Sequence, residues 1–236
     1  MSHAHYLPLT PVFFSFLVAA MVAVILAIQI GALHYAYMRL GMNSTTAFLL
    51  LAGSLVGSYF NIPVAHIAGE RVLTGEVVDF FGMQYQVPVL INRPGTTIAV
   101  NVGGAVIPTL MSIYLLARYD MWLRAAVATA GVALFVHSMA TPVPGLGIAV
   151  PVFVPALTTA IAAVLLARER AAPLAYVAGA LGTLIGADLL TLGVIGSLGA
   201  PIASIGGAGT FDGIFVTSIV AVLLASFYLP RKERTA

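Results

Sequence analysis

Two aspartates in apolar surroundings, Asp188 and Asp212, have the clearest capacity for chemistry in this sequence. The other acidic residues fall in segments expected to be loops or helix ends, where water can solvate them: Glu70, Glu76, Asp79, Asp120, Glu169 and Glu233. An ionisable side chain within a membrane span costs several kcal/mol and commonly marks a functional site. Two carboxyl groups that share a proton can activate water and polarise a scissile carbonyl, as in aspartic proteases. The pair therefore indicates aspartyl proteolysis, and the alternative is a structural role in which the acids only join two helices.

The helices expected around the two acids bring them to one level. Asp188 lies about four residues before the end of a helix expected at 173–192, and Asp212 about seven residues after the start of one expected at 205–228. At a rise of about 1.5 Å per residue, the acids are expected roughly 6 and 10 Å below the same membrane boundary. Glycines on both helices would let the backbones approach closely: Gly182, Gly186, Gly206, Gly207, Gly209 and Gly213.

The composition is that of an integral membrane protein. Of the 236 residues, 61% are hydrophobic and 8% are charged, whereas soluble domains are about 25% charged. The first apolar stretch is too long for a cleavable signal peptide and is expected to remain on the mature chain. The absence of cysteine excludes disulfides, thiolate metal sites and cysteine nucleophiles. The basic residues are spread singly over short loops, which argues against a nucleic-acid partner.

The hydrophobic pattern predicts an all-α integral membrane fold that forms one polytopic domain over residues 1–236. With about 20 apolar residues per span, seven transmembrane helices are expected, at residues 10–36, 45–61, 101–117, 122–139, 147–167, 173–192 and 205–228. All lysines and arginines except Arg71 and Arg93 then fall on one side of the membrane. Because cytoplasmic loops are enriched in these residues, we expect a cytoplasmic (inner) membrane protein with its N-terminus outside and its C-terminus in the cytoplasm.

The long connection at residues 66–100 is expected to lie outside the cell and to contain a small β-hairpin. Phe81, Met83, Tyr85 and Val87 alternate with polar or small residues, which is the period of a strand. Residues 92–95 read Asn-Arg-Pro-Gly, a turn signal, after which residues 96–100 are expected to return as the second strand.

Two pairs of similar segments indicate a parallel internal repeat. GSLVGSY at residues 53–59 matches GTLIGAD at residues 182–188, and NVGGA at residues 101–105 matches SIGGA at residues 204–208. Tyr59 then takes the position of Asp188, so the acids would belong to the second copy only. Chance similarity between glycine-rich apolar segments is the alternative to duplication.

A proline-rich segment precedes the fifth expected helix and is a candidate wall of the site. Its prolines exclude a regular helix throughout: Pro142, Pro144, Pro151 and Pro155. Irregular backbone at membrane depth is tolerated where it is buried in protein or lines a cavity. His137, at the outer end of the preceding helix, is expected at a depth similar to that of the aspartates, as a packed histidine without partners for a metal site.

The stretch GGAGTFDGIFVTSIVAVLLA resembles the GxGD segment of the presenilin and signal-peptide-peptidase class of intramembrane aspartyl proteases. The resemblance implies that Asp188 and Asp212 are catalytic and that Gly207 and Gly209 are the glycines before the second acid. The sequence departs from the class at residues 210–211, where a threonine and a phenylalanine separate the glycine from the acid.

Pro155, Ala156 and Leu157 spell the PAL motif of the same class, which implies a substrate-binding role for them. Here the motif precedes both acids, whereas in the class it follows them. The chain as a whole resembles a family of prokaryotic multi-pass proteins catalogued only as a domain of unknown function, and this second resemblance implies no activity.

These features predict an intramembrane aspartyl protease that cleaves a membrane-embedded or membrane-proximal peptide in the lipid bilayer. The main alternative is a proton- or cation-coupled transporter or channel that uses Asp188 and Asp212, and a third is an assembly factor that binds through the outer hairpin. No cofactor and no metal are expected, because GGAG lacks the lysine of a phosphate loop and no metal motif is visible. The sequence leaves the substrate and the oligomeric state open.

Overall fold

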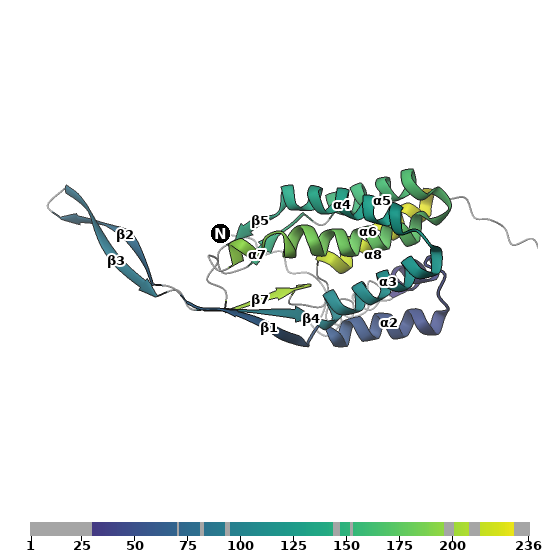
Figure 1. The fold of residues 1–236 in the computed structure, drawn as a ribbon, viewed down its shortest axis with the longest axis horizontal. Helices are drawn as coiled ribbons and strands as arrows, with labels where there is room; N and C mark the ends of the chain where they lie inside the picture. The colour runs from purple at the N-terminus through teal and green to yellow at the C-terminus, as the bar shows by residue number, and fades with distance from the viewer. Residues whose placement is uncertain are drawn as a thin grey trace, which may run out of the picture.

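In a computed structural model, the chain forms a bundle of helices with strands gathered at one end (Figure 1). The structure describes residues 30–69, 71–80, 83–92, 95–143, 147–151, 153–195, 201–207 and 213–228. The bundle and the strands meet at the point where the candidate site lies, so both are needed to position it.

Helix α6 (Ala171–Thr183) is the centre of the bundle, and its residues from 171 to 180 are all buried. It packs against the surrounding helices α3 (Ile107–Tyr119), α4 (Trp122–Met139), α5 (Phe153–Ala167) and α8 (Gly213–Tyr228). Helix α2 (Ser44–Gly57) lies beside α3 at the edge of the bundle (Figure 1).

Small residues let α6 approach its neighbours closely. A Cβ atom on Gly179 would lie 2.9 Å from the Cα atom of Ser218 in α8, and one on Gly182 would lie 2.6 Å from the Cγ1 atom of Val132 in α4. Helices in a membrane associate through such close packing, because lipid supplies little hydrophobic driving force between them. The alanine- and glycine-rich sequence of α6 therefore suits its central position.

A three-stranded sheet lies at one end of the bundle, with its strands in the order β1, β4, β7. Strand β1 (Asn61–Ile67) is antiparallel to β4 (Thr96–Asn101), and β7 (Ile202–Ile205) is parallel to β4. After β4 the π-helix η1 (Val102–Val106) leads into α3. The sheet thus joins segments that are about 100 residues apart, and β7 is an edge strand among those described.

A second, two-stranded sheet is a long hairpin that extends away from the helices (Figure 1). It consists of β2 (Arg71–Phe80) and β3 (Met83–Asn92). The predicted strand around Met83 lies within β3, and the predicted return strand is β4, but the predicted pairing of these two strands is wrong. β3 pairs with β2, and β4 pairs with β1 and β7, because alternation indicates a strand without specifying its partner.

Within the described residues, fewer helices reach membrane length than the sequence predicts for the whole chain, and most of the predicted span at residues 10–36 lies outside them. Among the described residues, the stretches long and apolar enough to cross a membrane are Val102–Tyr119, Trp122–Met139 and Phe153–Val194. The helices Ile30–Arg39 and Ser44–Gly57, which meet at a bend of 120°, would add a fourth if they are one span. The stretch Phe153–Val194 includes α5 and α6, which pack against each other. The apolar helices are compatible with a membrane protein, whereas the count of seven spans is not confirmed.

Strands replace several predicted helix ends. α2 ends at Gly57, and β1 then covers Asn61, where a helix was expected. α8 begins at Gly213, whereas the expected span started at 205, the last residue of β7. In the proline-rich segment, β5 (Thr141–Val143) pairs with β6 (Gly147–Ala149), so α5 begins later than expected. A short apolar strand beside a helix cannot be separated from it by periodicity alone.

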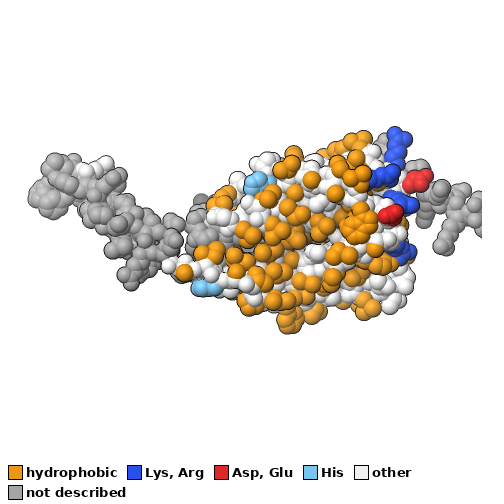
Figure 2. All heavy atoms as spheres, viewed as in Figure 1, with side chains coloured by type: hydrophobic (Ala, Val, Ile, Leu, Met, Phe, Trp, Pro, Cys, Tyr) orange, Lys and Arg blue, Asp and Glu red, His pale blue; other side chains and the backbone are white. Residues whose placement is uncertain are grey.

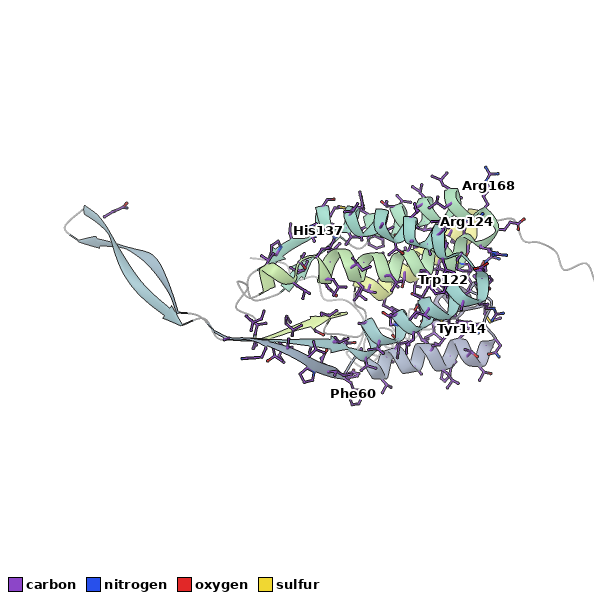
Figure 3. The ribbon with its side chains drawn as sticks, viewed as in Figure 1. Phe60, Tyr114, Trp122, Arg124, His137 and Arg168 are labelled. Carbon is purple, nitrogen blue, oxygen red and sulfur yellow. The ribbon has the colours of Figure 1, made fainter. Side chains whose placement is uncertain are left out.

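Arginine side chains gather at the end of the bundle opposite the sheet (Figure 2). Arg124 and Arg168 lie there, whereas His137 lies near the strands (Figure 3). Contacts tie this end together, since Arg170 donates to the carbonyl oxygen of Tyr119 and Arg39 donates to that of Ser226. The two ends of the bundle therefore differ in charge, as the sequence predicts.

Candidate functional site

Asp188 lies in η3 (Leu184–Leu189), a π-helical segment that continues α6 to the sheet. Its side chain is half-buried, and its Oδ2 atom accepts a hydrogen bond of 2.7 Å from the backbone N–H of Gly206. Hydrogen bonds to a charged group contribute about 1.5–3 kcal/mol. π-helical turns are rare and occur frequently at functional sites. The acid is thus held where the bundle meets the sheet.

A close approach of η3 to α4 fixes the backbone around Asp188. A Cβ atom on Gly186 would lie 3.0 Å from the Cβ atom of Val136. The Nδ1 atom of His137 lies 3.3 Å from the carbonyl oxygen of Gly186, so this histidine is at the depth of Asp188, as expected, although its side chain is exposed. After η3, the hydroxyl of Thr191 bonds back to the π-helical turn.

Gly206 and Gly207 turn the chain at the end of β7. Their φ angles of +89° and +76° lie in the left-handed region, which glycine adopts without steric cost. A Cβ atom on Gly206 would also lie 2.6 Å from the backbone nitrogen of Ala105. The turn directs the N–H of Gly206 to Asp188, so glycine is required here both by conformation and by space.

A neutral polar network lies beside this turn and is centred on Asn101, which is buried. Its Nδ2 atom donates to the carbonyl oxygen of Ser58 at 2.7 Å and to Oδ1 of Asn61 at 3.1 Å. Its own Oδ1 atom accepts the N–H of Gly104 at 2.8 Å. The hydroxyl of Ser204 lies 2.7 Å from Oδ1 of Asn61, which links β7 to β1. The network fixes the sheet against the helices with uncharged groups.

Among the described strands, none pairs with the outer edge of β7, and this edge lies on the side of Asp188. Thr97 donates its N–H to the carbonyl oxygen of Pro201 at 3.0 Å, so the backbone groups of residues 201, 203 and 205 face β4. Those of Ile202, Ser204 and Gly206 face the other way, and the N–H of Gly206 meets Asp188 there. An extended peptide can add to such an edge by backbone hydrogen bonds.

Comparison with known proteins identifies the family. The family described as Protein of unknown function (DUF1614) matches residues 55–224. The chain belongs to this family. The matched region of this DUF1614 protein contains Asp188, Gly206 and the network around Asn101. No curated protein and no solved structure matches the chain.

Asp212 and Gly209 of the DUF1614 protein lie outside the described residues. The distance between the carboxyl groups of Asp188 and Asp212 is therefore not described either. The helices that would carry the acids do pack together, because Gly179 of α6 touches Ser218 of α8. At a rise of about 1.5 Å per residue, Asp188 lies about 13 Å along the helix from this contact. Gly213, the first residue of α8, lies about 8 Å from the same contact. Both lie toward the sheet, since α6 starts and α8 ends at the arginine-rich end.

The other residues predicted for the site are placed as follows. Gly207 directly follows Gly206, whose backbone N–H donates to Asp188. Pro155 and Ala156, near the start of α5, are buried, whereas Leu157 is 52% exposed. Since α5 packs on α6 and α8, the first two residues of the PAL motif face the bundle and Leu157 faces away from it.

The sequence reasoning missed the neutral network. NVGGA at residues 101–105 contributes to the predicted repeat through its glycines, and the asparagine that opens it is not among the predicted site residues. A polar residue directly before a helix is a signal for an N-cap. Asn101 is the N-cap of η1, so this signal was present in the sequence.

Proposed function

We propose that this DUF1614 protein is an intramembrane aspartyl protease that cleaves a membrane-embedded or membrane-proximal peptide with Asp188 and Asp212. The observation that carries the proposal is the carboxylate of Asp188, half-buried at the end of an apolar helix and bound by the N–H of Gly206 beside an edge strand. The chain that follows Gly206 leads within a few residues to Asp212. One short stretch would then position the first acid and carry the second.

In the proposed reaction the two carboxyl groups share one proton. The ionised carboxylate removes a proton from water, the water oxygen bonds to the scissile carbonyl carbon, and the protonated carboxyl gives its proton to the carbonyl oxygen. The tetrahedral intermediate then breaks its C–N bond. The carboxyl that took a proton from water gives it to the leaving amine, and a hydroxyl of the intermediate returns a proton to the other carboxylate, so the pair again shares one proton. One water molecule accounts for both products.

The proposed substrate binds as an extended strand along β7. A helical peptide hides its amides in helical hydrogen bonds and must unwind before one of them can be attacked. The backbone N–H and carbonyl groups of Ile202 and the N–H of Ser204 face the outer edge of β7 and would stabilise the unwound form, whereas the carbonyl oxygen of Ser204 accepts the N–H of Gly207. The paired strand would end beside Gly206 and therefore beside Asp188.

The proposal includes a placement in the cytoplasmic (inner) membrane, with seven spans and the N-terminus outside. The arginines at one end of the bundle support a cytoplasmic position for that end, which would leave the sheet and Asp188 near the outer surface. A parallel internal repeat is also part of the proposal. It is supported by the parallel pairing of β4 and β7, each of which leads to a pair of glycines and then to a helix.

The position of Asp188 favours a protease over a proton- or cation-coupled transporter. A transporter binds its ion near the bilayer midplane, whereas Asp188 is next to Leu189, the last residue of η3.

Cleavage by the purified protein tests the proposal. The full chain in detergent is incubated with a set of synthetic single-span peptides, and the products are identified by mass spectrometry. Asp188→Asn and Asp212→Asn should each lower cleavage by at least about 100-fold, because general acid–base catalysis contributes about 10²–10⁴-fold. Asp120→Asn is the matched control, since this aspartate is exposed at the far end and its φ of 46° suits asparagine.

Two results would count against the protease. Undiminished cleavage by Asp188→Asn, with thermal unfolding unchanged, would remove the acid from the reaction. A hydroxyl-bearing peptide that imitates the tetrahedral intermediate should raise the melting temperature of the wild type and not of Asp188→Asn, and equal stabilisation of both would exclude the proposed site.

A further inference from the structure

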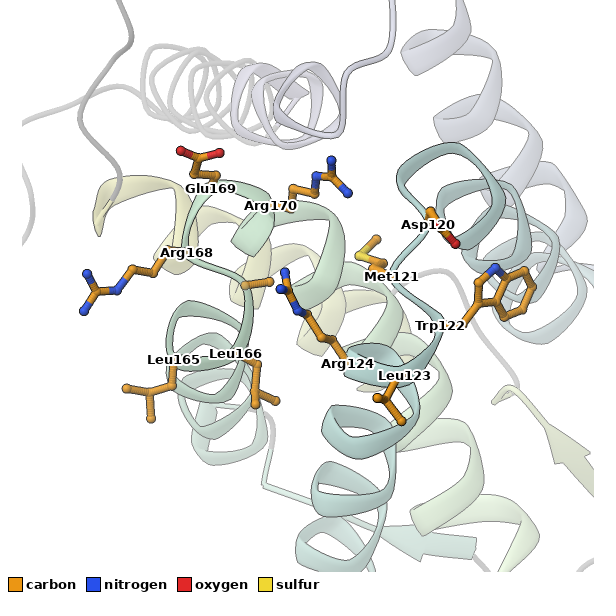
Figure 4. A pocket seen from close by; sticks show the side chains of 11 residues that line it. Asp120, Met121, Trp122, Leu123, Arg124, Leu165, Leu166, Arg168, Glu169 and Arg170 are labelled. Atoms are coloured by element: carbon orange, nitrogen blue, oxygen red, sulfur yellow. The ribbon is translucent and has the colours of Figure 1, made fainter.

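A cavity of about 890 Å³ lies at the arginine-rich end of the bundle (Figure 4). One wall is the turn between α3 and α4, and the other is the turn between α5 and α6. The hydrogen bond from Arg170 to the carbonyl oxygen of Tyr119 ties these two turns together. The cavity is therefore part of the fold, and it lies at the opposite end from Asp188 and the sheet.

Positive charge predominates in the lining. Arg124, Arg168 and Arg170 line the cavity together with Asp120 and Glu169. Figure 4 shows Arg124 on the α4 side and Arg168 on the α5 side, with Asp120 next to Trp122. Within the described part of the chain, no ion pair joins these arginines to either acid. The guanidinium groups of Arg124 and Arg168, which are exposed, can therefore bind an anion.

The remaining lining residues are apolar, and several of them face outward. Leu123 is 79% exposed and Leu165 is 76% exposed, one on each wall. Trp122, which is 54% exposed, begins an apolar helix of membrane length. Tryptophan is enriched where a membrane helix meets the lipid headgroups. Cationic groups and exposed leucines thus occur together at the level expected for lipid phosphates.

We propose that this cavity binds the phosphodiester headgroup of an anionic phospholipid. Arg124 and Arg168 bind the phosphate oxygens, since the planar guanidinium matches them in a bidentate manner. The acyl chains lie against Leu123 and Leu165. Basic pockets between helices on the cytoplasmic side of a membrane protein bind headgroups of this class. The inference depends on the membrane orientation proposed above and is independent of the proteolytic chemistry.

The leucines distinguish a lipid from a soluble anion. A free phosphate or an acidic peptide would engage the arginines and leave Leu123 and Leu165 in water, whereas a phospholipid covers both kinds of surface. The headgroup must also be anionic, because the ammonium group of a zwitterionic lipid would add positive charge to a lining that already has an excess of it.

Lipid binding to the full chain in a neutral detergent tests this proposal. Phosphatidylglycerol and phosphatidylcholine are titrated separately, and the bound lipid is counted by native mass spectrometry. We expect phosphatidylglycerol to bind at least about 10-fold more tightly than phosphatidylcholine. The double variant Arg124→Gln with Arg168→Gln should lose this preference. Arg118→Gln, at the same end but outside the cavity, should keep it.

Several outcomes would overturn the proposal. These are equal binding of the two lipids, an unchanged preference in the double variant, or an equal loss in Arg118→Gln, which would indicate a general surface effect. Competition by inorganic phosphate at the concentration of the lipid would identify a soluble-anion site instead. If the double variant does not fold, Arg168→Gln alone should lower the preference at least about 3-fold, and no change would reject the site. None of these measurements uses cleavage, so their failure is separate from failure of the protease.

Discussion

Two glycine junctions in the sheet share a sequence pattern and differ in structure. The first glycine junction, residues 101–105, follows β4, and the π-helix η1 begins there at once, capped by Asn101. The second glycine junction, residues 204–207, ends β7, and its glycines adopt left-handed conformations. The helix that follows it in the described chain begins only at Gly213. The same pattern thus starts a helix in one place and a turn in the other.

The residues that open the two junctions account for this difference. Asn101 has an acceptor that reaches the N–H of Gly104, three residues ahead, and this bond sets the first helical turn. Ser204 stands at the matching position, but there the N–H of Gly207 donates to the backbone carbonyl oxygen of Ser204 at 3.2 Å. That bond closes a turn, which leaves the N–H of Gly206 for Asp188.

The comparison separates the scaffold from the candidate chemistry. The first glycine junction is satisfied by neutral side chains nearby, whereas the second uses a carboxylate 18 residues earlier in the chain. At the position of Asp188 in the matching first segment stands Tyr59, which is 77% exposed. The first junction joins the sheet to a helix with neutral groups alone. A junction of this kind therefore does not require an acid, and Asp188 is not explained by the needs of the sheet.

The largest expected effect comes from putting an acid into the first glycine junction. Asn101→Asp removes the donor to Ser58 and Asn61 and buries a carboxyl group against two oxygens. The carbonyl oxygen of Ser58, left without its donor, costs about 1–3 kcal/mol, and a buried carboxyl facing oxygens costs more, while Oδ1 of Asn61 keeps the hydroxyl of Ser204; the free energy of unfolding should therefore fall by about 3–5 kcal/mol. The reverse exchange, Asp188→Asn, should change it by less than about 1 kcal/mol, because an amide oxygen still accepts from Gly206.

Thermal unfolding or SDS titration in detergent compares the two variants. If Asp188→Asn destabilises the fold as much as Asn101→Asp does, the acid is structural and the contrast between the junctions fails.

An intermediate effect is expected for Gly206→Ala. Left-handed backbone costs a residue with a side chain about 1–2 kcal/mol, and the added methyl would crowd Ala105, which costs about 1–3 kcal/mol. The loss should therefore be about 2–5 kcal/mol, with the melting temperature as the measurement. Gly131→Ala is the control, because nothing lies within 4 Å of its Cβ position in α4 and alanine favours a helix by about 0.5–1 kcal/mol. A Gly206→Ala variant as stable as the wild type would show that the turn is not constrained.

The smallest effects concern two hydroxyls that the sequence pattern places in matching positions. Ser54 donates to the carbonyl oxygen of Gly103 at 2.8 Å, so Ser54→Ala should cost about 1 kcal/mol. Thr183, its counterpart, has a buried hydroxyl for which no hydrogen-bond partner occurs among the described residues. Thr183→Val should therefore be neutral or stabilising by up to about 1 kcal/mol in the same unfolding assay. A clear destabilisation by Thr183→Val would mean that this hydroxyl holds a partner and that the two positions are equivalent.

Helix positions were predictable where charged turns separate long apolar stretches. The predicted helix at 122–139 coincides with α4, Trp122–Met139, because Asp120 and the proline-rich segment bound it in the sequence. Strand β4 lies where the sequence predicts a strand, at residues 96–100, whereas β7 was harder to predict, since it is short and apolar and is followed directly by glycines. Their pairing was beyond sequence reasoning, because nothing local relates Ala99 to Ser204.

The sequence singles out Asp188 as a candidate, because an acid in an apolar stretch has a high desolvation cost. Its donor was not identified. The sequence predicts Gly206 only as a small residue at a helix contact, whereas in the structure its backbone N–H donates to Asp188. Asn101 was overlooked for a similar reason, since a neutral amide costs less to bury than a charge and attracts less attention in a membrane sequence.

By itself, the sequence determined that the chain is apolar and mainly helical, that its arginines other than Arg71 and Arg93 belong at one end, and that an acid stands toward the other. Those properties depend on composition and order along the chain, which solvation energies act on directly. The tertiary structure decided that β7 joins β4 in parallel, that one glycine pair is helical and the other left-handed, and that Asp188 meets Gly206. These depend on which backbone groups lie within hydrogen-bonding distance across the fold, and only the packing of distant segments sets that.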